Sequence, residues 1–377
     1  MLQKFFLILI AILTSVSAIA YDFSAENSDG VTIYYNIDGT NAIVTYGDSR
    51  YSGTVVIPES VTYNEITYFV TSIGDDAFFL CDNLTSVTLP ESITSIGDNA
   101  FNYCALKSIT IPSGVTTIGN RAFHLCTPLL SITIPESVIT IGEEAFSECW
   151  LMVNANINAS IVGARAFYDC NDLATIRIGN SVKKIETEAF YDCKDLITIT
   201  LGTSLENVDT KAFKGCRNIK RLLCNSITPP TLGDYVFEPE IFPTCELIVP
   251  APSLGKYKSA EQWKEFYNIS GFDVIEAESI ILNNRTLEMK VGDTKQLTAT
   301  VLPEDVTYNT VTWKSYNEDI VTVDDNGNVV ALTTGSTTIT ATCGNVYATC
   351  EVTVVDESGI EAIGVDENGH KVEVYTL

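Results

Sequence analysis

The sequence predicts a repeat solenoid, with short strands on one face and turns and short helices on the other, followed by an all-β sandwich. The pair Ala-Phe recurs seven times, at spacings of 21 to 23 residues. A cysteine stands three residues after each of these phenylalanines. A fixed period of this length is typical of stacked repeats. From residue 278 onward the repeat stops, and short strand-like runs separated by turn signals replace it.

Length and charge exclude several classes of protein. The chain has 377 residues, too many for one ordinary domain, and 46% of them are hydrophobic, which excludes wholesale disorder. The 48 acidic residues outnumber the 22 basic ones, so the net charge is −26. A surface this acidic repels phosphate backbones, which disfavours nucleic acid as a partner. Two histidines leave little material for histidine-based catalysis or metal binding.

Residues 1–20 have the features of an export signal. Lys4 precedes an apolar run over residues 5–12, and Ala18-Ile19-Ala20 fits a cleavage site. The apolar run is shorter than the roughly 20 residues that a membrane-spanning helix needs. We therefore predict a signal peptide over 1–20, a secreted or cell-surface protein, and no transmembrane segment after cleavage.

The repeat unit reads C-x-x-L-x-x-I-x-I-P-x-x-V-x-x-I-G-x-x-A-F-x-x. Leu84, Val87 and Leu89 are spaced to enter one core from a half-buried strand, which Pro90 ends because proline donates no ladder hydrogen bond. Residues 98–101 are predicted to open a brief helical turn. One repeat cannot bury its apolar side alone, so the stacked repeats must share a continuous core.

Both ends of the solenoid need caps. Residues 21–70 are predicted to form the N-terminal cap region, in which 54–58 imitate a repeat strand. The solenoid with its C-terminal cap is predicted over 71–275, with a local irregularity after Cys149, where the proline is missing. The spacing of four apolar residues predicts an amphipathic capping helix; they are Tyr257, Trp263, Phe266 and Ile269.

The repeat resembles that of the BspA-like leucine-rich repeat proteins, the repeat type also found in treponemal surface proteins. This resemblance covers roughly residues 51–275. It implies a leucine-rich repeat solenoid and, as its function, adhesion to host matrix proteins or to other bacteria.

Residues 278–356 contain seven or eight short strand-like runs, which predict an immunoglobulin-like sandwich. They resemble the bacterial Ig-like domain of group 2 through runs such as Val291-Gly292-Asp293, Val311-Thr312-Trp313 and Val321-Thr322-Val323-Asp324. We expect Trp313 to be the buried core anchor. Residues 357–377 are predicted to be a linker and a truncated tail, with a strand over 372–377.

The cysteine column invites a chemical interpretation. Stacked repeats lie roughly 5 Å apart, so neighbouring thiols could form disulfides or hold metal. The repeat cysteines are odd in number and lack the C-x-x-C pairs of zinc sites. We therefore expect them to be reduced and to fill small buried slots. In the second domain, a tight turn at Gly344-Asn345 would place Cys343 opposite Val346 and Cys350 opposite Ile339. That register disfavours a bridge between these two cysteines.

No catalytic residue, metal site or cofactor is predicted. The chain contains no G-x-S-x-G, H-E-x-x-H or P-loop motif. Residues 324–328 could be a calcium loop, but they lack the ligand spacing of an EF-hand and fit a hairpin turn better. His124 occupies a variable repeat position, which we interpret as solvent-facing.

The outward positions of the repeat strands are the candidate ligand-binding site. They carry mostly hydroxyl and amide groups and no acid, although Ser and Thr also favour exposed strand positions for their own sake. We predict a surface binding protein that uses this face for host or bacterial protein or glycan ligands, with the Ig-like domain as a spacer. The alternative is an envelope structural or glycan-capture protein without host-protein binding. The predicted residues are Ser86, Thr88, Ser108, Thr110, Ser131, Thr133, Asn154, Asn156, Thr175, Arg177, Thr198, Thr200 and Arg221.

Overall fold

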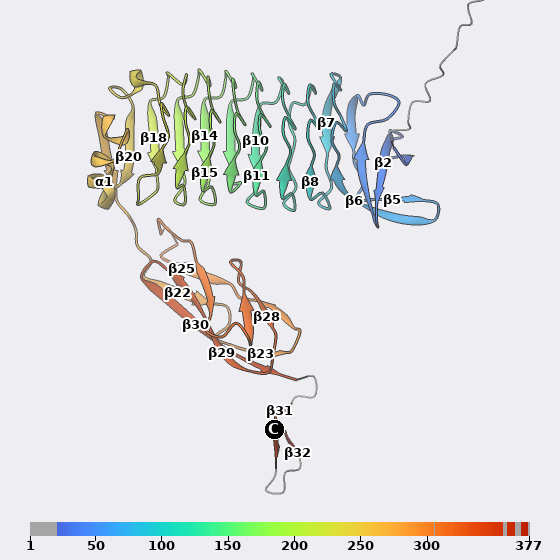
Figure 1. Ribbon diagram of the computed structural model, residues 1–377, viewed down its shortest axis with the longest axis vertical. Coiled ribbons are helices and arrows are strands. Elements are labelled where there is room, and N and C mark those ends of the chain that lie inside the picture. The colour runs from blue at the N-terminus through green and yellow to red at the C-terminus, as the bar shows by residue number, and fades with distance from the viewer. Residues whose placement is uncertain (1–20, 305, 357–359, 366–370, 376–377) are drawn as a thin grey trace, which may run out of the picture. The chain divides into compact units, whose positions relative to one another are not determined.

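The computed structural model describes residues 21–304 and 306–356, together with the backbone of 360–365 and 371–375. The predicted signal peptide lies outside these residues. The chain divides into two compact units, Met1–Phe272 and Asp273–Leu377 (Figure 1). The first is the predicted solenoid and the second contains the predicted sandwich.

From Ser131 onward, successive turns of the solenoid each contribute one strand to a long-strand sheet. This sheet has seven strands, parallel and in sequence order. They are β10 (Ser131–Ile134), β12 (Asn154–Ile157), β14 (Thr175–Ile178), β16 (Thr198–Leu201), β18 (Arg221–Cys224), β20 (Glu246–Pro250) and β21 (Asn268–Phe272). Alternate side chains of β10, β12 and β14 are buried, as predicted for a half-buried strand.

A second, short-strand sheet was not predicted. It uses two residues of each repeat, as in β11 (Thr140–Ile141), and the position after them is glycine in most repeats but Glu186 and Asp209 in two. A Cβ on Gly142 would lie 2.5 Å from the backbone carbon of Gly119, so this turn has no room for a side chain where it packs against the preceding one. The other repeat strands are β8 (Ser95–Ile96), β9 (Thr117–Ile118), β13 (Ile161–Val162), β15 (Lys184–Ile185), β17 (Asn207–Val208) and β19 (Thr231–Leu232).

The N-terminal cap extends the short-strand sheet with antiparallel strands. These are β1 (Phe23–Glu26), β2 (Thr32–Asp38) and β3 (Asn41–Thr45), and β3 pairs with β6 (Ile66–Ile73), which also pairs with β5 (Ser60–Tyr63). The strand predicted over 54–58 is present as β4 (Gly53–Val56). It pairs in parallel with β7 (Leu84–Thr88), so it does imitate a repeat strand.

The brief helical turn predicted at 98–101 is wrong. Asn99 and Tyr103 have φ values of 53° and 60°, which a right-handed helix does not allow. Their amides instead bond to the next repeat: Asn99 N–H to the carbonyl of Asn120 at 2.9 Å and Tyr103 N–H to that of His124 at 2.9 Å. Hydrogen bonds to the next repeat therefore alternate with local turn bonds, such as that from the N–H of Asn102 to the carbonyl of Asn99 at 3.0 Å, and no helix forms.

Phenylalanine rings form the centre of the core. The ladder is Phe78, Phe101, Phe123, Phe146, Phe167, Phe190, Phe213 and Phe237, with neighbouring centroids 4.8 to 5.6 Å apart and planes within 11° of parallel. Tyr51 covers its first ring, and Trp263 and Phe266 meet its last ring edge-on. The repeated Ala-Phe pair thus builds one continuous column.

The repeat cysteines fill buried slots beside this column, as predicted. The thiol of Cys126 donates to the carbonyl of Phe101 at 3.1 Å, and that of Cys149 to the carbonyl of Phe123 at 3.2 Å. The contact repeats along the column through Cys216. Burial raises the pKa of the Cys126 thiol to about 12, so the protonated donor form is favoured.

The predicted irregularity after Cys149 lies in the connection and not in the strand. The strand β12 is in register with β10 and β14, but the connection to β13, residues 158–160, is shorter than residues 135–139 between β10 and β11 and lacks their turn. A second irregularity, which was not predicted, begins after Cys104, because Leu106 follows that cysteine by two positions where the other repeats have three. Residues 108–111 form no strand, and the long-strand sheet begins only at β10.

The C-terminal cap is not one amphipathic helix. Only Tyr257 lies on α1 (Leu254–Ser259), while Trp263 begins the 3₁₀ helix η3 (Trp263–Glu265) and Ile269 lies on β21. Two further 3₁₀ helices precede them, η1 (Pro239–Ile241) and η2 (Ala251–Ser253). Burial of the aromatic rings is nevertheless as predicted, since Tyr257, Trp263 and Phe266 are at most 3% exposed.

The second unit has the predicted β-sandwich character. One sheet contains β23 (Thr286–Lys290), β30 (Val346–Val355), β29 (Gly335–Cys343) and β26 (Thr312–Ser315). Another contains β24 (Thr294–Gln296), β28 (Asn328–Ala331) and β27 (Val321–Val323), and β22 (Ser279–Leu282) pairs with β25 (Ala299–Leu302). Two further strands, β31 (Ile360–Val365) and β32 (Lys371–Tyr375), form an antiparallel pair, and β32 overlaps the strand predicted over 372–377.

Trp313 is not the buried anchor of this unit. It is half-buried at the core's margin, whereas Leu297, Val321 and Ile339 are fully buried. The hairpin register is as predicted, because Cys343 lies opposite Val346 and Cys350 opposite Ile339.

Candidate functional site

The outward side chains of the long-strand sheet form two rows in register. The first row runs Ser131, Asn154, Thr175, Thr198 and Arg221, and the second runs Thr133, Asn156, Arg177 and Thr200. Paired parallel strands place these side chains roughly 4.8 Å apart along each row. We call the two rows the strand face. Its hydroxyl and amide groups can hydrogen-bond to an extended ligand that runs along the solenoid axis.

Four of the predicted residues lie outside the strand face. Ser86 and Thr88 are on β7, which pairs with β4 rather than with the long-strand sheet. Ser108 and Thr110 are in the segment that forms no strand. At the C-terminal end of the strand face, Glu246 of β20 continues the first row beside Arg221. The next side chain of that row is therefore acidic.

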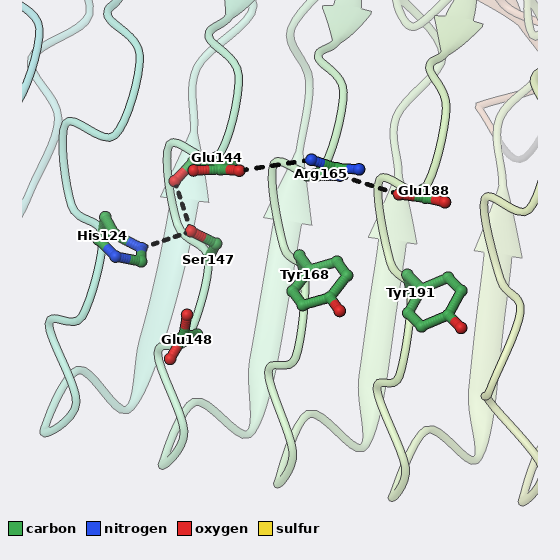
Figure 2. Close-up of a pocket in the computed structure, with 8 residues that line it drawn as sticks. All are labelled: His124, Glu144, Ser147, Glu148, Arg165, Tyr168, Glu188 and Tyr191. Carbon is green, nitrogen blue, oxygen red and sulfur yellow. Dashed lines mark hydrogen bonds and ion pairs between the residues drawn. The ribbon is translucent and has the colours of Figure 1, made fainter.

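A hollow of about 430 Å³ lies on a different part of the repeats, which we call the turn face. It was not predicted. The residues come from four successive turns that flank the Ala-Phe pairs (Figure 2). They are His124, Glu144, Ser147, Glu148, Arg165, Tyr168, Glu188 and Tyr191.

A ladder of alternating charges borders this hollow. Glu144 accepts from Arg121 at 2.6 Å and lies 3.8 Å from Arg165. Glu188 accepts from Arg165 at 2.8 Å and lies 3.4 Å from Lys211. Each member precedes an Ala-Phe pair, so residues 23, 21, 23 and 23 positions apart become neighbours in space.

The ladder perturbs the acids and bases that form it. Partial burial raises the pKa of Glu188, but the hydrogen bonds and charges of Arg165 and Lys211 outweigh it and hold the net pKa below the ordinary value. The hydrogen bond to Glu188 raises the pKa of Arg165. Both groups are therefore charged at neutral pH, and the ladder is a set of ion pairs.

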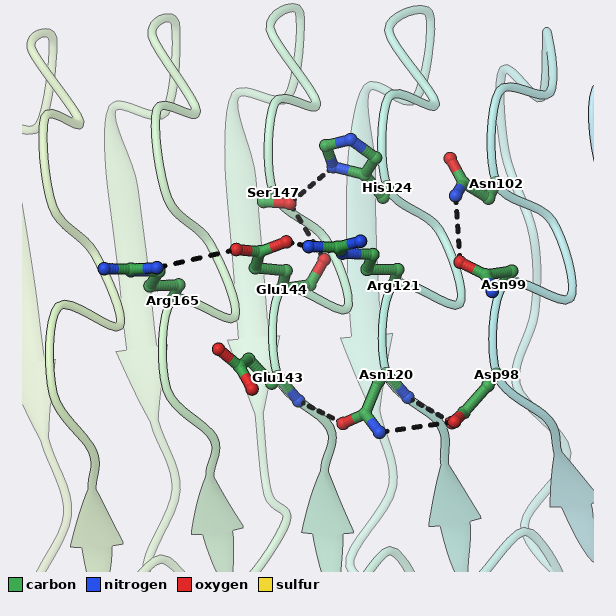
Figure 3. Close-up of polar contacts among 10 residues, drawn as sticks. All are labelled: Asp98, Asn99, Asn102, Asn120, Arg121, His124, Glu143, Glu144, Ser147 and Arg165. Atoms are coloured by element: carbon green, nitrogen blue, oxygen red, sulfur yellow. Dashed lines mark hydrogen bonds and ion pairs between the residues drawn. The ribbon is translucent and has the colours of Figure 1, made fainter.

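His124 is half-buried rather than fully solvent-facing. Its Nδ1 lies 2.6 Å from the hydroxyl oxygen of Ser147, which itself is 2% exposed and donates to the carbonyl of Glu144 (Figure 3). Burial lowers the pKa of His124 below its ordinary value, although the charges of Glu148 and Glu144 act in the opposite direction. The imidazole is therefore neutral at neutral pH.

A second polar ladder satisfies backbone amides at the start of the turns that begin at Asp98, Asn120 and Glu143. The Asp98 carboxylate accepts from the backbone N–H of Asn120 at 2.7 Å, and the Asn120 side chain accepts from the N–H of Glu143 at 2.8 Å (Figure 3). These contacts explain why Asp or Asn recurs at this position without a helix to cap.

A sequence signal for the turn face exists. The residue before successive Ala-Phe pairs reads Arg121, Glu144, Arg165, Glu188 and Lys211, which alternates in charge. Aligning the repeats and comparing charges between neighbouring copies would have found it. Charge patterns within one repeat do not show it, because the partners are separated by a whole period.

Metal-ligand groups and long apolar helices are absent from the described part of the chain. Among those residues, no group of three His, Cys, Asp or Glu side chains is arranged to hold a metal ion. The Asp324 carboxylate accepts from the backbone amides of Asn326 and Asn328, as a hairpin turn requires. No helix within 21–304 or 306–356 is long and apolar enough to cross a membrane.

Two sequence families match the chain. Residues 57–162 and 160–241 match the BspA type leucine rich repeat region, in six copies. Residues 276–354 match the bacterial Ig-like domain of group 2.

Individual relatives match shorter segments. An uncharacterized protein of Clostridium acetobutylicum is 42% identical over 91 residues, 22% of this chain and 23% of its own length. A 3-O-alpha-D-galactosyl-alpha-L-arabinofuranosidase of Bifidobacterium longum subsp. longum is 32% identical over 132 residues, 30% of this chain and 12% of the enzyme. The chain thus matches less than a quarter of either relative. A solved leucine-rich repeat protein of T. pallidum is 27% identical, covers 59% of this chain and 86% of its own, and has a TM-score of 0.40.

Proposed function

The chain belongs to the BspA-type leucine-rich repeat proteins and carries a bacterial Ig-like domain of group 2, and from this we propose that it is an exported binding protein of the bacterial surface. Proteins with these repeats are typically secreted or found at the cell surface, and they typically bind other molecules rather than catalyse reactions. The signal peptide predicted over 1–20 supplies the export route in this proposal.

The strand face carries the proposal. Its two rows place hydrogen-bonding side chains on consecutive strands in strict register, from β10 to β18. Arg177 and Arg221 add positive charge to a chain whose net charge is −26. An extended protein ligand with backbone carbonyls and acidic side chains would find acceptors and donors repeated along this surface, as peptides do when they follow a sheet.

A binding screen tests the proposal. Residues 21–377 are applied to immobilised host matrix proteins and to a glycan array, beside a variant with alanine at Thr175, Arg177, Thr198 and Arg221. We expect saturable binding to a protein ligand that weakens at least about tenfold in the variant, because several polar contacts are lost together. A matched control replaces Ser86 and Thr88, which lie outside the strand face, and should bind as the native chain does.

A glycan ligand is the second candidate. The partial likeness to an arabinofuranosidase motivates it, because a segment shared with a carbohydrate-active enzyme could hold the same class of molecule. Hydroxyl and amide side chains, which dominate the strand face, also suit sugar hydroxyls. Binding on the glycan array without binding to matrix proteins would favour this candidate over the first, and binding to neither would contradict both.

A further inference from the structure

A row of apolar residues borders the strand face where the long strands begin. It occupies the repeat position directly before the first residue of β10, β12, β14 and β16. Leu130, Val153 and Ile197 are 54%, 41% and 47% exposed, and Ala174 is half-buried. The N–H of Val153 bonds to the carbonyl of Leu130 at 2.8 Å, and the N–H of Ile197 bonds to that of Ala174 at 2.9 Å. These four residues therefore follow one another on consecutive turns, and we call them the apolar row.

The fold does not require apolar side chains at this position. Thr85 holds the same position in the first repeat, directly after the buried Leu84, and is exposed. Single exposed apolar residues are common on any protein surface, but a contiguous set of them is typical of an interaction site. The apolar row is such a set, because its members are neighbours in space although they lie a whole repeat apart in the sequence.

A lysine continues the apolar row at each end. The N–H of Leu130 bonds to the carbonyl of Lys107 at 3.3 Å, and the N–H of Lys220 bonds to that of Ile197 at 2.9 Å. Both lysine side chains are exposed. Among residues 21–304 and 306–356, neither of them takes part in an ion pair. The charges thus favour a partner that carries acidic groups at both ends of an apolar surface.

The spacing of the apolar row determines the form of that partner. Neighbouring turns lie roughly 4.8 Å apart, so four members span about 14 Å. An α-helix parallel to the solenoid axis places residues i, i+3, i+7 and i+10 on one face over about 15 Å. An extended strand places side chains of one face about 6.7 Å apart, which does not match the turns. The distance from Lys107 to Lys220, about 24 Å, corresponds to about 16 residues of helix.

The neighbouring positions limit where the partner's acidic groups can lie. Along each turn the strand face follows the apolar row, and it is uncharged at Asn154, Thr175 and Thr198. The exposed Asp172 and Asp195 precede the apolar row by two residues. They would repel acidic groups on that flank of a helix, so the acidic groups of the partner belong at its ends.

We propose that the apolar row is the docking site for an amphipathic helix of a partner protein, whose acidic ends contact Lys107 and Lys220. This inference rests on the proposed role of the chain as a binding protein. It uses no residue of the strand face, so the two can be tested separately.

A designed helical peptide tests the site on residues 21–377. The labelled peptide has about 18 residues, with leucine at positions i, i+3, i+7 and i+10, glutamate at both ends, and alanine and glutamine elsewhere. Fluorescence anisotropy follows its binding, which we expect to be saturable. A peptide of the same composition with leucine at alternate positions should bind at least about tenfold more weakly, and so should the helical peptide with lysine ends.

A double variant removes the apolar contacts. Leu130→Thr combined with Ile197→Thr should weaken binding of the glutamate-ended peptide at least about tenfold, because two side chains buried in the complex are lost. The fold should tolerate both changes, since Thr85 holds this position. Ile139→Thr is the matched control and should bind normally. Ile139 is 60% exposed and precedes the short strand β11 rather than a long strand.

A second double variant reverses the charges at the ends. Lys107→Glu combined with Lys220→Glu should reverse the preference, so that the lysine-ended peptide binds more tightly than the glutamate-ended one. A preference that does not change would overturn the proposal. Unchanged affinity of the double threonine variant, or equal binding of the peptide with alternate leucines, would also overturn it.

Two further outcomes separate this proposal from its alternatives. If the chain sediments as a dimer that Leu130→Thr with Ile197→Thr converts to a monomer, the apolar row is covered by a second copy and the proposal is wrong. If no helical peptide binds while a matrix protein does, this inference fails and the proposed function stands. The double threonine variant keeps every residue of the strand face, so its binding to a matrix protein reports on the strand face alone.

Discussion

The thiol of Cys170 donates a hydrogen bond to the backbone carbonyl of Phe146, 3.1 Å away in the preceding repeat. Both residues are completely buried. This contact links the two columns that the sequence repeats, the cysteines and the phenylalanines, and gives the cysteine a role that its small size alone does not. It satisfies a carbonyl group that water cannot reach.

The first prediction concerns that hydrogen bond. Cys170→Ala leaves the Phe146 carbonyl without its donor and should lower the free energy of unfolding by about 1–3 kcal/mol. Denaturant unfolding followed by circular dichroism measures the loss. Ala174→Gly, at a half-buried site outside the column, is a control for the removal of a small side chain. An unchanged stability of Cys170→Ala would show that the thiol acts only by filling space.

The column thiols should also resist chemical labelling. Burial raises the pKa of Cys104, Cys126 and Cys149, so at pH 8 they are not the thiolates that react with disulfide reagents or iodoacetamide. We expect no labelling of the native column within hours and complete labelling in denaturant, measured by mass spectrometry of digested protein. Rapid labelling of Cys126 in the native state would contradict the slot that the structure shows.

Replacing a phenylalanine at the centre of the ladder by alanine should destabilise the fold strongly. Phe146 has a ring on each side, at 5.0 and 5.1 Å between centroids, so Phe146→Ala should cost about 3–5 kcal/mol. Phe79→Ala, at a 39% exposed position, should cost far less. Thermal unfolding compares the two, and equal losses would contradict the buried central position of Phe146 in the ladder.

The lowered pKa of Glu188 predicts that the stability of the fold depends on pH. Its pKa is lowered in the folded protein, so its stabilising contribution is complete above the unfolded value of 4.5 and is lost as the pH falls through the lower folded value. Glu188→Gln should therefore lower Tm by roughly 2 °C at pH 7, and the difference from the native chain should vanish in strong acid. High salt should also reduce the difference, and Glu136→Gln should show none of these effects. A difference that persists below pH 3 would contradict the ion-pair explanation.

The shortened repeat can be repaired. Inserting one threonine between Ala105 and Leu106 restores the three-residue spacing from cysteine to leucine seen at Cys81 and Leu84. We expect residues 108–111 to join the long-strand sheet between β7 and β10, because their hydroxyl-bearing and apolar residues already alternate as in a strand. Amide hydrogen exchange should then slow over these residues. As a control, a threonine inserted between Ser113 and Gly114 leaves the spacing from Cys104 to Leu106 unchanged. Amide hydrogen exchange over residues 108–111 should then not slow.

Much of the fold could be predicted because the repeat imposes its own period. Leu129, Ile132 and Ile134 return at the same positions in each copy, so burial in one repeat implies burial in all of them. The hairpin register of Cys343 and Val346 followed from two turn residues in the same way. Local geometry was harder: Asn99 suggested a helix cap, and only the hydrogen bond to Asn120 in the next repeat shows why no helix forms.

The sequence by itself determined the repeated core and the side chains that the long strands expose. Tertiary structure alone decided that Arg165 joins Glu144 to Glu188, and that the short spacing from Cys104 to Leu106 interrupts the sheet. The reason is physical. Alternation and burial depend on neighbours along the chain, whereas pairing and hollows depend on residues one period away, and only stacking brings these together.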